Sequence, residues 1–397
     1  MATVPQTGSR LPRSAHDTGR ALGTRRSRFD MSLLRDLDPW LIGATLAISV
    51  LGMLMIYSST RERLRLEGVD ELYFVKRQGI AILVGLVVMA LLLAIDYRKL
   101  RDYSAFAYVA TVVGLLAVLS PLGSNARGSQ AWFQLPGGFQ LQPSELVKFG
   151  IIIALAGYAN EHRGEMNPWR LTVTIALAAV PIGLVMLQPD FGTAMVLGLV
   201  VITLLAVAGV SVRHLVVLAL LGVTFVIAVV NVGLLQKYQV DRLTSFVSQG
   251  ADTRNTTYNT DQSKNAIGNG GVTGRGFGDG SQTAGGFVPE QHTDFIFTAV
   301  GEEFGFLGGA ALLALFAIVV WRTWRASLFA RDSFGTLVCV GVLAMFVFQI
   351  FENMGMTMGI MPVTGIPLPF MSYGGSSTVT AFACVALVAN VSMRRFR

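Results

Sequence analysis

Asp294 is the residue whose type and position best suit chemistry in this sequence. It lies in Val288-Pro-Glu-Gln-His-Thr-Asp-Phe-Ile-Phe297, where a long polar stretch gives way to an apolar run. A carboxylate at the mouth of a bilayer is shielded on one side and hydrated on the other, so it can be ionised and still contact a polar substrate. The neighbouring His292 is more commonly a local hydrogen-bonding group than a base.

A second candidate site opens another apolar run, at Gln142-Pro-Ser-Glu-Leu-Val-Lys148. Glu145 and Lys148 are three residues apart, so they share one face of a helix and can pair. Ser144 suits the helix N-terminus. A charged pair inside a membrane span is costly unless it faces the bundle interior or a water-filled cavity. These residues alone favour a structural ion pair and a functional pair equally.

The composition indicates the elements that position these residues. Of 397 residues, 52% are hydrophobic and 14% are charged, whereas soluble domains are about a quarter charged. Apolar runs fall at 39–58, 79–95, 104–121, 144–158, 171–187, 191–209, 212–234, 295–321, 334–356 and 376–393. At roughly 20 residues per crossing, the sequence predicts an all-α polytopic membrane protein with about ten transmembrane helices. A disordered basic tail is expected at 1–38 and a transmembrane domain at 39–397.

Basic residues are divided unevenly between the two sets of connections. One set contains Arg98, Lys99, Arg101, Arg163, Arg170, Arg213, Arg322, Arg325, Arg331, Arg394, Arg395 and Arg397. The connections at 122–143, 188–190 and 357–375 hold only Arg127. Because short cytoplasmic loops are enriched in Lys and Arg, both termini are predicted to be cytoplasmic. The first outer connection is an exception, with Arg61, Arg63, Arg65, Lys76 and Arg77.

The outer side then carries the segments best suited to a ligand. The longest connection, 235–294, lies between the seventh and eighth helices, and its glycines permit close approach to a ligand. The segment Met361–Ser377 contains three prolines and ends in Ser376 and Ser377. Such irregular backbone near membrane depth must be buried in protein or line a cavity. Arg242 follows the seventh helix and either meets an anionic lipid head or is a solvated surface arginine.

Several other polar residues are explained by the fold alone. Asp190, in Gln188–Thr193, is expected to cap the next helix. Glu302, Glu303 and Glu352 lie within apolar runs, where hydrogen bonds to neighbouring helices would be sufficient to account for them.

Some functional classes are excluded. Cys339 and Cys384 fall inside apolar runs, so they are core residues and offer neither a disulfide framework nor a metal knuckle. No Walker pattern is present, which leaves a nucleotide-binding loop unsupported. The net charge of +7 follows from membrane orientation, and the sequence lacks the arginine–aromatic stretches that favour nucleic-acid binding.

Together the motifs resemble the SEDS (shape, elongation, division and sporulation) family of RodA, FtsW and SpoVE. The matching segments are Tyr57-Ser58-Ser59, Lys76-Arg77-Gln78, Gln142-Pro-Ser-Glu145 with Lys148, Gln188-Pro-Asp190 with Gly192-Thr193, Asp241-Arg-Leu243, Gln262-Ser263 with Ala266-Ile-Gly268, Pro289–Phe295 with Gly301-Glu-Glu303, and Pro362–Ser377. They follow the order of the family and span nearly the whole chain after residue 38. Met354-Gly-Met-Thr357 and Met361–Gly365 look more like RodA than FtsW, which implies a role in elongation and cell shape.

The resemblance implies a peptidoglycan glycosyltransferase of the bacterial plasma membrane. Such proteins polymerise lipid II on the outer face, beside a class B penicillin-binding protein that acts as transpeptidase. Asp294 would be the catalytic carboxylate, a general base for the acceptor hydroxyl. The undecaprenyl diphosphate leaving group needs cations. The implied substrate-binding set is Glu145, Lys148, Arg77, Arg242, Gln142, Ser144, His292, Ser376 and Ser377. A divalent cation, Mg²⁺ or Mn²⁺, is compatible with this chemistry, although the sequence shows no dedicated cage.

The sequence departs from the family at one place. Many relatives carry an Arg-Trp pair before the fourth span and an arginine two residues before Gln-Pro. Here the positions read Ala131-Trp132 and Gln140. Arg127 lies nearby and is a candidate replacement for holding the diphosphate.

Two other functional classes stay open at this point. A flippase for a lipid-linked precursor would also have broken helices and intramembrane charges, but the candidate charges gather at the outer boundary instead of tracing a path across the bilayer. A non-enzymatic scaffold leaves the polar cluster around Asp294 unexplained. An FtsW-like polymerase specific to division is the alternative within the family.

Overall fold

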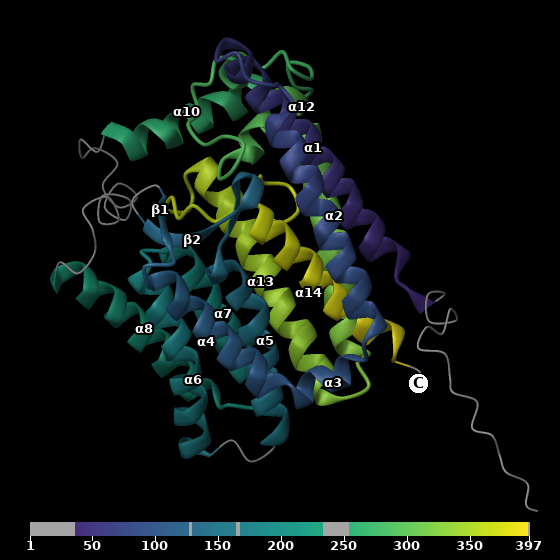
Figure 1. Cartoon of the computed structure of the whole chain (residues 1–397), viewed down its shortest axis with the longest axis vertical. Coiled ribbons are helices and arrows are strands. Elements are labelled where there is room, and N and C mark those ends of the chain that lie inside the picture. Colours follow the sequence, from purple (N-terminus) through teal and green to yellow (C-terminus); the bar gives the residue numbers. More distant parts are fainter. Residues whose placement is uncertain (1–35, 127–128, 164–166, 233–253, 396–397) are drawn as a thin grey trace, which may run out of the picture.

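The computed structural model describes residues 36–126, 129–163, 167–232 and 254–395. Within these ranges the chain is mainly helical (Figure 1). The long helices are α1 (Pro39–Leu66), α2 (Tyr73–Ala94), α4 (Ser104–Leu119), α5 (Pro143–Glu161), α6 (Pro168–Leu187), α7 (Phe191–Val207), α8 (Val212–Val232), α12 (Ile296–Leu328), α13 (Ser333–Met358) and α14 (Gly375–Met393). Each predicted apolar run coincides with one of these helices within the described residues. The tail at 1–35 lies outside the described residues.

Shorter elements occupy the connections. They are α3 (Tyr97–Asp102), α10 (Arg254–Gly270), α11 (Ser281–Ala284) and the strands β1 (Ser124–Ala126), β2 (Ser129–Leu135) and β3 (Phe139–Leu141). The strands form an antiparallel sheet in the order β1-β2-β3, with Phe133 opposite Leu141. The all-α class of the membrane domain is confirmed, and the three short strands are confined to the connection 122–143. Strand pairing satisfies the backbone donors and acceptors there without a helix.

Some of the long helices, α1 and α13 among them, begin where a polar side chain accepts from the first free amides. Asp38 accepts from the amides of Trp40 at 3.1 Å and Leu41 at 3.2 Å, ahead of a proline in the first turn of α1. Asp332 accepts from Gly335 N at 2.7 Å and caps α13 in the same way. Caps of this kind satisfy orphan amides and fix where a helix starts.

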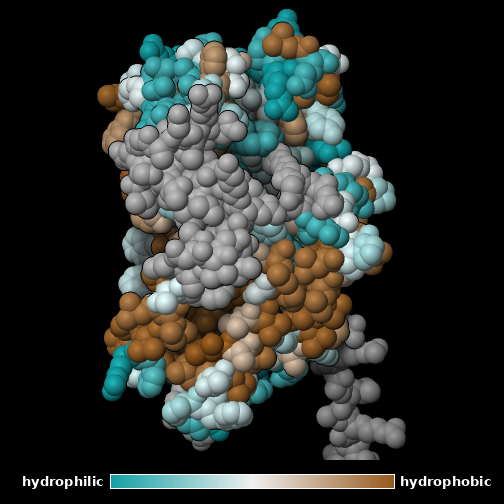
Figure 2. Space-filling view, turned by 90° about the vertical axis from the view of Figure 1, so that its left-hand side faces the viewer, coloured by the Kyte–Doolittle hydropathy of each residue, from teal (hydrophilic) through white to brown (hydrophobic). Residues whose placement is uncertain are grey.

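The fold is that of a multi-pass membrane protein. Among the described residues, six helices are long and apolar enough to cross a membrane: α1, α2, α6, α12, α13 and α14. The helices α4 and α7 and the first part of α8 are apolar but shorter. The face shown in Figure 2 has a hydrophobic band in its lower half, between hydrophilic ends. The number of membrane crossings, about ten from the sequence, stays a prediction.

The centre of the bundle is formed by α5, α13 and α14 (Figure 1). Of the 18 most apolar consecutive residues in each helix, 72% in α13 and 89% in α14 are buried inside the protein, whereas the share in α2 is 22%. Helices α2 and α14 pack against each other, as do α4 and α5. The charged residues Glu145 and Lys148 on α5 are accordingly buried inside the protein.

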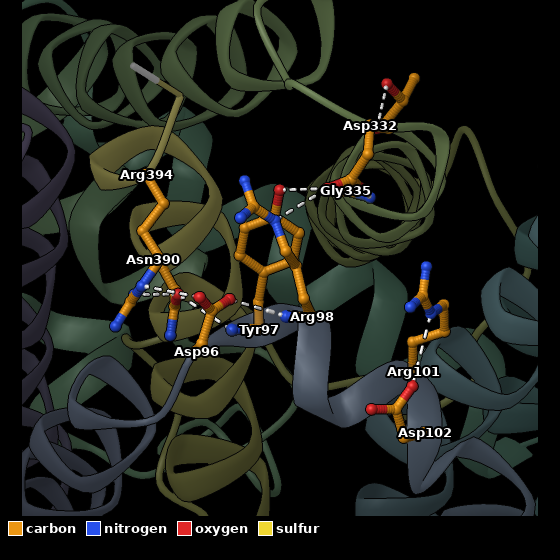
Figure 3. A network of polar contacts seen from close by, with 10 residues as sticks. Asp96, Tyr97, Arg98, Arg101, Asp102, Asp332, Gly335, Asn390 and Arg394 are labelled. Carbon is orange, nitrogen blue, oxygen red and sulfur yellow. Dashed lines mark hydrogen bonds and ion pairs between the residues drawn. The ribbon is translucent and has the colours of Figure 1, made fainter. Parts of the chain in front are cut away.

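One polar end of the bundle joins several helix termini. Arg322 of α12 donates to the cap residue Asp38. Figure 3 shows a second group of contacts at the same end. Tyr97 Oη donates to Asp332 Oδ2 at 2.6 Å, and Arg394 Nε lies 3.8 Å from Asp96 Oδ2. The start of α1 and the end of α14 consequently share this end. The cytoplasmic location of both is still a prediction.

Candidate functional site

Asp294 lies in the tight turn that leads into α12, and its side chain is half-buried. The turn starts at Glu290, whose φ of 52° is in the left-handed region. Its carbonyl accepts from the amides of Thr293 and Asp294, both at 3.1 Å. Asn353 of α13 donates to the Asp294 carbonyl at 2.8 Å. The backbone of Asp294 is thus held from two sides, by the turn itself and by α13.

His292 links this turn to two other elements. Its ring lies 4.7 Å from the ring of Phe74 on α2 and 5.6 Å from that of Tyr373, centroid to centroid. The His292 carbonyl accepts from Tyr373 N at 2.9 Å. The ring contacts are packing contacts, the hydrogen bond is made by the backbone, and the role of the imidazole stays a prediction. Together the contacts bring the segment before α14 against the turn that carries Asp294.

Glu145 and Lys148 form a bidentate ion pair on α5. Lys148 Nζ lies 2.8 Å from each carboxylate oxygen of Glu145. The two residues are 4% and 1% exposed. Because α5 is central in the bundle, this pair faces protein and not lipid, which is where intramembrane charges are tolerated. The expected pairing is present, and its part in binding a substrate is untested by the geometry.

Residues at the start of α5 are tied to α7 and α14. Ser144 Oγ and Gln142 Nε2 donate to Asp190 Oδ2 at 2.9 and 3.2 Å. The other oxygen of Asp190 accepts from Thr193 N at 3.0 Å, which confirms the predicted helix cap. Ser376 Oγ accepts from Gln142 N at 2.9 Å. This end of α5 is therefore locked to two neighbouring helices.

The remaining predicted site residues lie on several different elements or outside the described residues. Ser377 is half-buried in the first turn of α14. Arg77 donates to the carbonyls of Gly138 at 2.9 Å and Gly137 at 3.0 Å, and its guanidinium lies 4.3 Å from the Tyr73 ring centroid. Arg77 therefore fastens the β2–β3 turn to α2. Arg242 and Arg127 lie outside the described residues.

The basic residues that broke the orientation pattern have local partners. Arg61, near the end of α1, donates to the Gly278 carbonyl at 2.6 Å. Arg63 lies 3.3 Å from Glu67, and Lys76 pairs with Asp70. The hydrogen bond from Lys76 lowers the pKa of the Asp70 carboxyl. Together with Arg77, these pairings give a local partner to four of the five basic residues between the last part of α1 and the first part of α2.

Acidic residues deeper in the bundle hold neighbouring elements. Glu302 accepts from the amides of Gln282 and Thr283, both at 2.8 Å. Glu303 accepts from Ser58 on α1. Glu352 accepts from Thr364 Oγ1 at 2.9 Å. The structural interpretation of these carboxylates from the sequence therefore agrees with their hydrogen bonds.

Three amide side chains at the site were not singled out from the sequence. Gln78 Nε2 donates to Thr378 Oγ1 at 2.9 Å, Asn353 reaches Asp294, and Gln291 reaches Thr298 at 2.9 Å. Buried amides in or beside apolar runs are the signal that could have found them, because an unpaired amide in such surroundings is costly. Across the ranges that the structure describes, no three His, Cys, Asp or Glu side chains converge on a metal position.

Together these helices define a polytopic membrane protein with a buried charge pair on α5 and a half-buried aspartate in the turn before α12. The family model for the FtsW, RodA and SpoVE cell cycle proteins matches residues 39–396. The chain belongs to this family, the SEDS family of the sequence analysis.

Named relatives span nearly the whole chain. A probable peptidoglycan glycosyltransferase FtsW of Geobacter metallireducens is 36% identical, covering 88% of this chain and 92% of the relative. Stage V sporulation protein E of Bacillus subtilis is 35% identical over 89% and 96%. Peptidoglycan glycosyltransferase MrdB of Escherichia coli K12 is 31% identical over 90% and 94%. The chain is accordingly a glycosyltransferase of this family.

Solved structures agree with the fold. A chain of a peptidoglycan synthase complex, solved to explain how polymerisation and crosslinking are coordinated, superposes with a TM-score of 0.75 at 29% identity. The match covers 91% of this chain and 99% of that chain. The rod shape determining protein RodA of Thermus thermophilus gives 0.67 at 29% identity, over 91% and 98%.

Proposed function

We propose that this glycosyltransferase polymerises lipid II into glycan strands on the outer face of the plasma membrane, with Asp294 as general base. The observation that carries the proposal is the setting of Asp294. Its backbone is fixed by the Asn353 amide at 2.8 Å and by the Glu290 carbonyl at 3.1 Å, yet the residue is half-buried and not fully enclosed. A base must be rigidly positioned and still reach a substrate hydroxyl.

The reaction transfers one proton, forms a glycosidic bond and breaks the bond between the donor sugar and its diphosphate. The acceptor sugar hydroxyl gives its proton to the Asp294 carboxylate as its oxygen attacks the anomeric carbon of the donor. The bond from that carbon to the diphosphate oxygen breaks, and the lipid diphosphate leaves with the electron pair. Preorganised cations stabilise the charge that develops on the leaving group. Lys148, Arg77 and Arg242 are the proposed cations, and Mg²⁺ or Mn²⁺ carried with the diphosphate is compatible with this step.

The remaining residues of the proposed binding set shape the approach to Asp294. Gln142, Ser144 and Ser376 form the tie between α5, α7 and α14, and His292 packs beside Tyr373. Glu145 orients Lys148 by ion pairing at 2.8 Å. Ser377 stands next to Ser376 at the start of α14.

We further propose a role in cell elongation with a class B penicillin-binding protein as transpeptidase. Support comes from the RodA-like sequence motifs Met354–Thr357 and Met361–Gly365 and from the similarity to a chain of a peptidoglycan synthase complex. An FtsW-like role in division is the alternative, because the relatives with 36% and 35% identity are named FtsW and stage V sporulation protein E. Complementation of hosts depleted of the elongation or the division polymerase separates the two roles, and rescue of division alone would overturn the elongation assignment.

The direct test of the activity uses purified protein and labelled lipid II, with and without the transpeptidase partner. Asp294→Asn keeps the size of the side chain but cannot take the proton. Loss of a general base costs about 100- to 10,000-fold in rate, so glycan strands should fall by that factor. Insertion and partner binding should persist, because the backbone contacts of Asp294 do not use its charge.

A matched control is Asp279→Asn, which makes the same chemical change at an exposed residue of the glycine-rich stretch Gly274–Gly280. It should polymerise at the wild-type rate. Near wild-type polymerisation by Asp294→Asn would overturn the assignment of the base, and Glu145 would be the next candidate.

A further inference from the structure

The side chain of Gln291 closes the turn that carries Asp294. Gln291 Nε2 donates to Thr298 Oγ1 at 2.9 Å, and Thr298 Oγ1 donates to the Phe295 carbonyl at 2.6 Å. Gln291 is 3% exposed and Thr298 is fully buried. Asp294 lies between the two ends of this tie, so the hydrogen bond fixes the width of the turn around it.

The same amide nitrogen of Gln291 also connects the turn to the short helix α11. Gln291 Nε2 donates to Thr283 Oγ1 at 3.0 Å, and Thr283 Oγ1 donates to Glu302 Oε2 at 2.8 Å. Glu302 is fully buried on α12 and also accepts from the Thr283 amide at 2.8 Å. A Cβ added to Gly280 would lie 2.8 Å from Glu302 Oε2, so the glycine leaves room for this carboxylate.

The directions of these hydrogen bonds are fixed by counting protons. Each threonine hydroxyl has a single proton. Thr298 commits its proton to a carbonyl and Thr283 commits its proton to a carboxylate, so both oxygens accept from Gln291. The two protons of the Gln291 amide nitrogen match these two acceptors. Gln291 Oε1 is buried without a hydrogen-bond partner among the described residues, so the amide nitrogen makes both of the contacts by which this side chain joins the network.

We propose that Gln291, together with Thr283, Thr298 and Glu302, forms a positioning network that sets the location of the Asp294 carboxylate. This inference rests on the proposed role of Asp294 as the base. The network touches neither substrate nor reacting atoms, and acts through the turn. A displacement of about 1 Å at a reacting group can cost roughly 100-fold in rate, so loosening the turn lowers the rate of the chemical step.

The test compares two substitutions at one residue in the full-length protein. Thr298→Val keeps the volume and removes the hydroxyl, whereas Thr298→Ser keeps the hydroxyl. With labelled lipid II, Thr298→Val should lower kcat about 10- to 100-fold and leave KM within about twofold. Thr298→Ser should restore kcat to within about threefold of the wild type. A buried residue with a purely structural role would not require the hydroxyl once the protein is folded.

Thr283→Val and Thr283→Ser repeat the comparison at the other end of the network, in case Thr298→Val fails to fold. Thermal unfolding in detergent verifies the fold of each variant before kinetics are measured. Wild-type kcat in a folded Val variant, or Ser variants as slow as the Val variants, would overturn the proposal.

Asp294→Asn is assayed alongside these variants to separate the two proposals. Loss of activity in Asp294→Asn with normal activity in both Val variants refutes the positioning network alone. Full activity in Asp294→Asn refutes the role of Asp294 as base, and with it the purpose of the network.

Discussion

The side-chain amide of Asn353 donates to the backbone carbonyl of Asp294 at 2.8 Å. The same nitrogen donates to the Ile366 carbonyl, also at 2.8 Å. One buried amide on α13 therefore holds the turn before α12 and the proline-rich segment before α14 together. Two segments separated by about a whole helical hairpin in the sequence depend on this residue for their relative position.

Asn353→Leu should impair both stability and activity. The substitution leaves two buried carbonyls without their donor, and each unpaired group costs about 1–3 kcal/mol. We expect a lower unfolding temperature and at least about a tenfold loss of polymerisation, because the Asp294 backbone is released. Thermal unfolding in detergent and the lipid II assay measure the two effects. Wild-type behaviour in both would contradict the assigned role, and Met354→Leu serves as a neighbouring control.

The Glu145–Lys148 pair should behave as one unit. Glu145→Gln or Lys148→Met alone strands a buried charge, which costs about 3–5 kcal/mol. The double variant removes both charges and should lose less than the sum of the two single effects. Folding yield, thermal unfolding and activity of the four proteins complete the cycle. Strict additivity in all three measurements would refute the coupling.

Tyr97→Phe tests the contact between α3 and α13. Burial, followed by the hydrogen bond to Asp332, raises the pKa of the Tyr97 hydroxyl. The fold thus favours the protonated phenol, and its contribution to stability is complete below the unfolded pKa of about 10 and lost as the pH rises above it. Tyr97→Phe should be destabilised by about 0.5–1.5 kcal/mol at pH 7, with a smaller difference from wild type above pH 10. Thermal unfolding at several pH values measures this, and a difference that stays constant with pH would count against the contact.

The predicted orientation can be tested by cysteine labelling. Cys339 and Cys384 are buried, so added cysteines are read against a low background. Thr257→Cys should react with a membrane-impermeant reagent from the outside, and Ser14→Cys only after the membrane is opened. Reaction of both from the same side would contradict cytoplasmic termini and an outer 235–294 connection.

The sequence by itself determined the membrane class, the helices and the polar residues worth testing. Runs of apolar residues have one stable solution in lipid, because an isolated backbone must satisfy its own hydrogen bonds there. The Glu145–Lys148 pairing followed equally well, since a spacing of three residues on a helix is a local property. The Asp190 cap was local in the same sense.

Only the tertiary structure decided what fixes Asp294. Its partner Asn353 is 59 residues away in the sequence, and no periodic pattern in the chain links a buried amide to the carbonyl it will meet. Arg77 shows the same limit, because its residue type does not reveal that its guanidinium donates to the carbonyls of Gly137 and Gly138. Hydrogen bonds between remote segments depend on how the helices pack, and that packing is set by the whole bundle and not by any one stretch of residues.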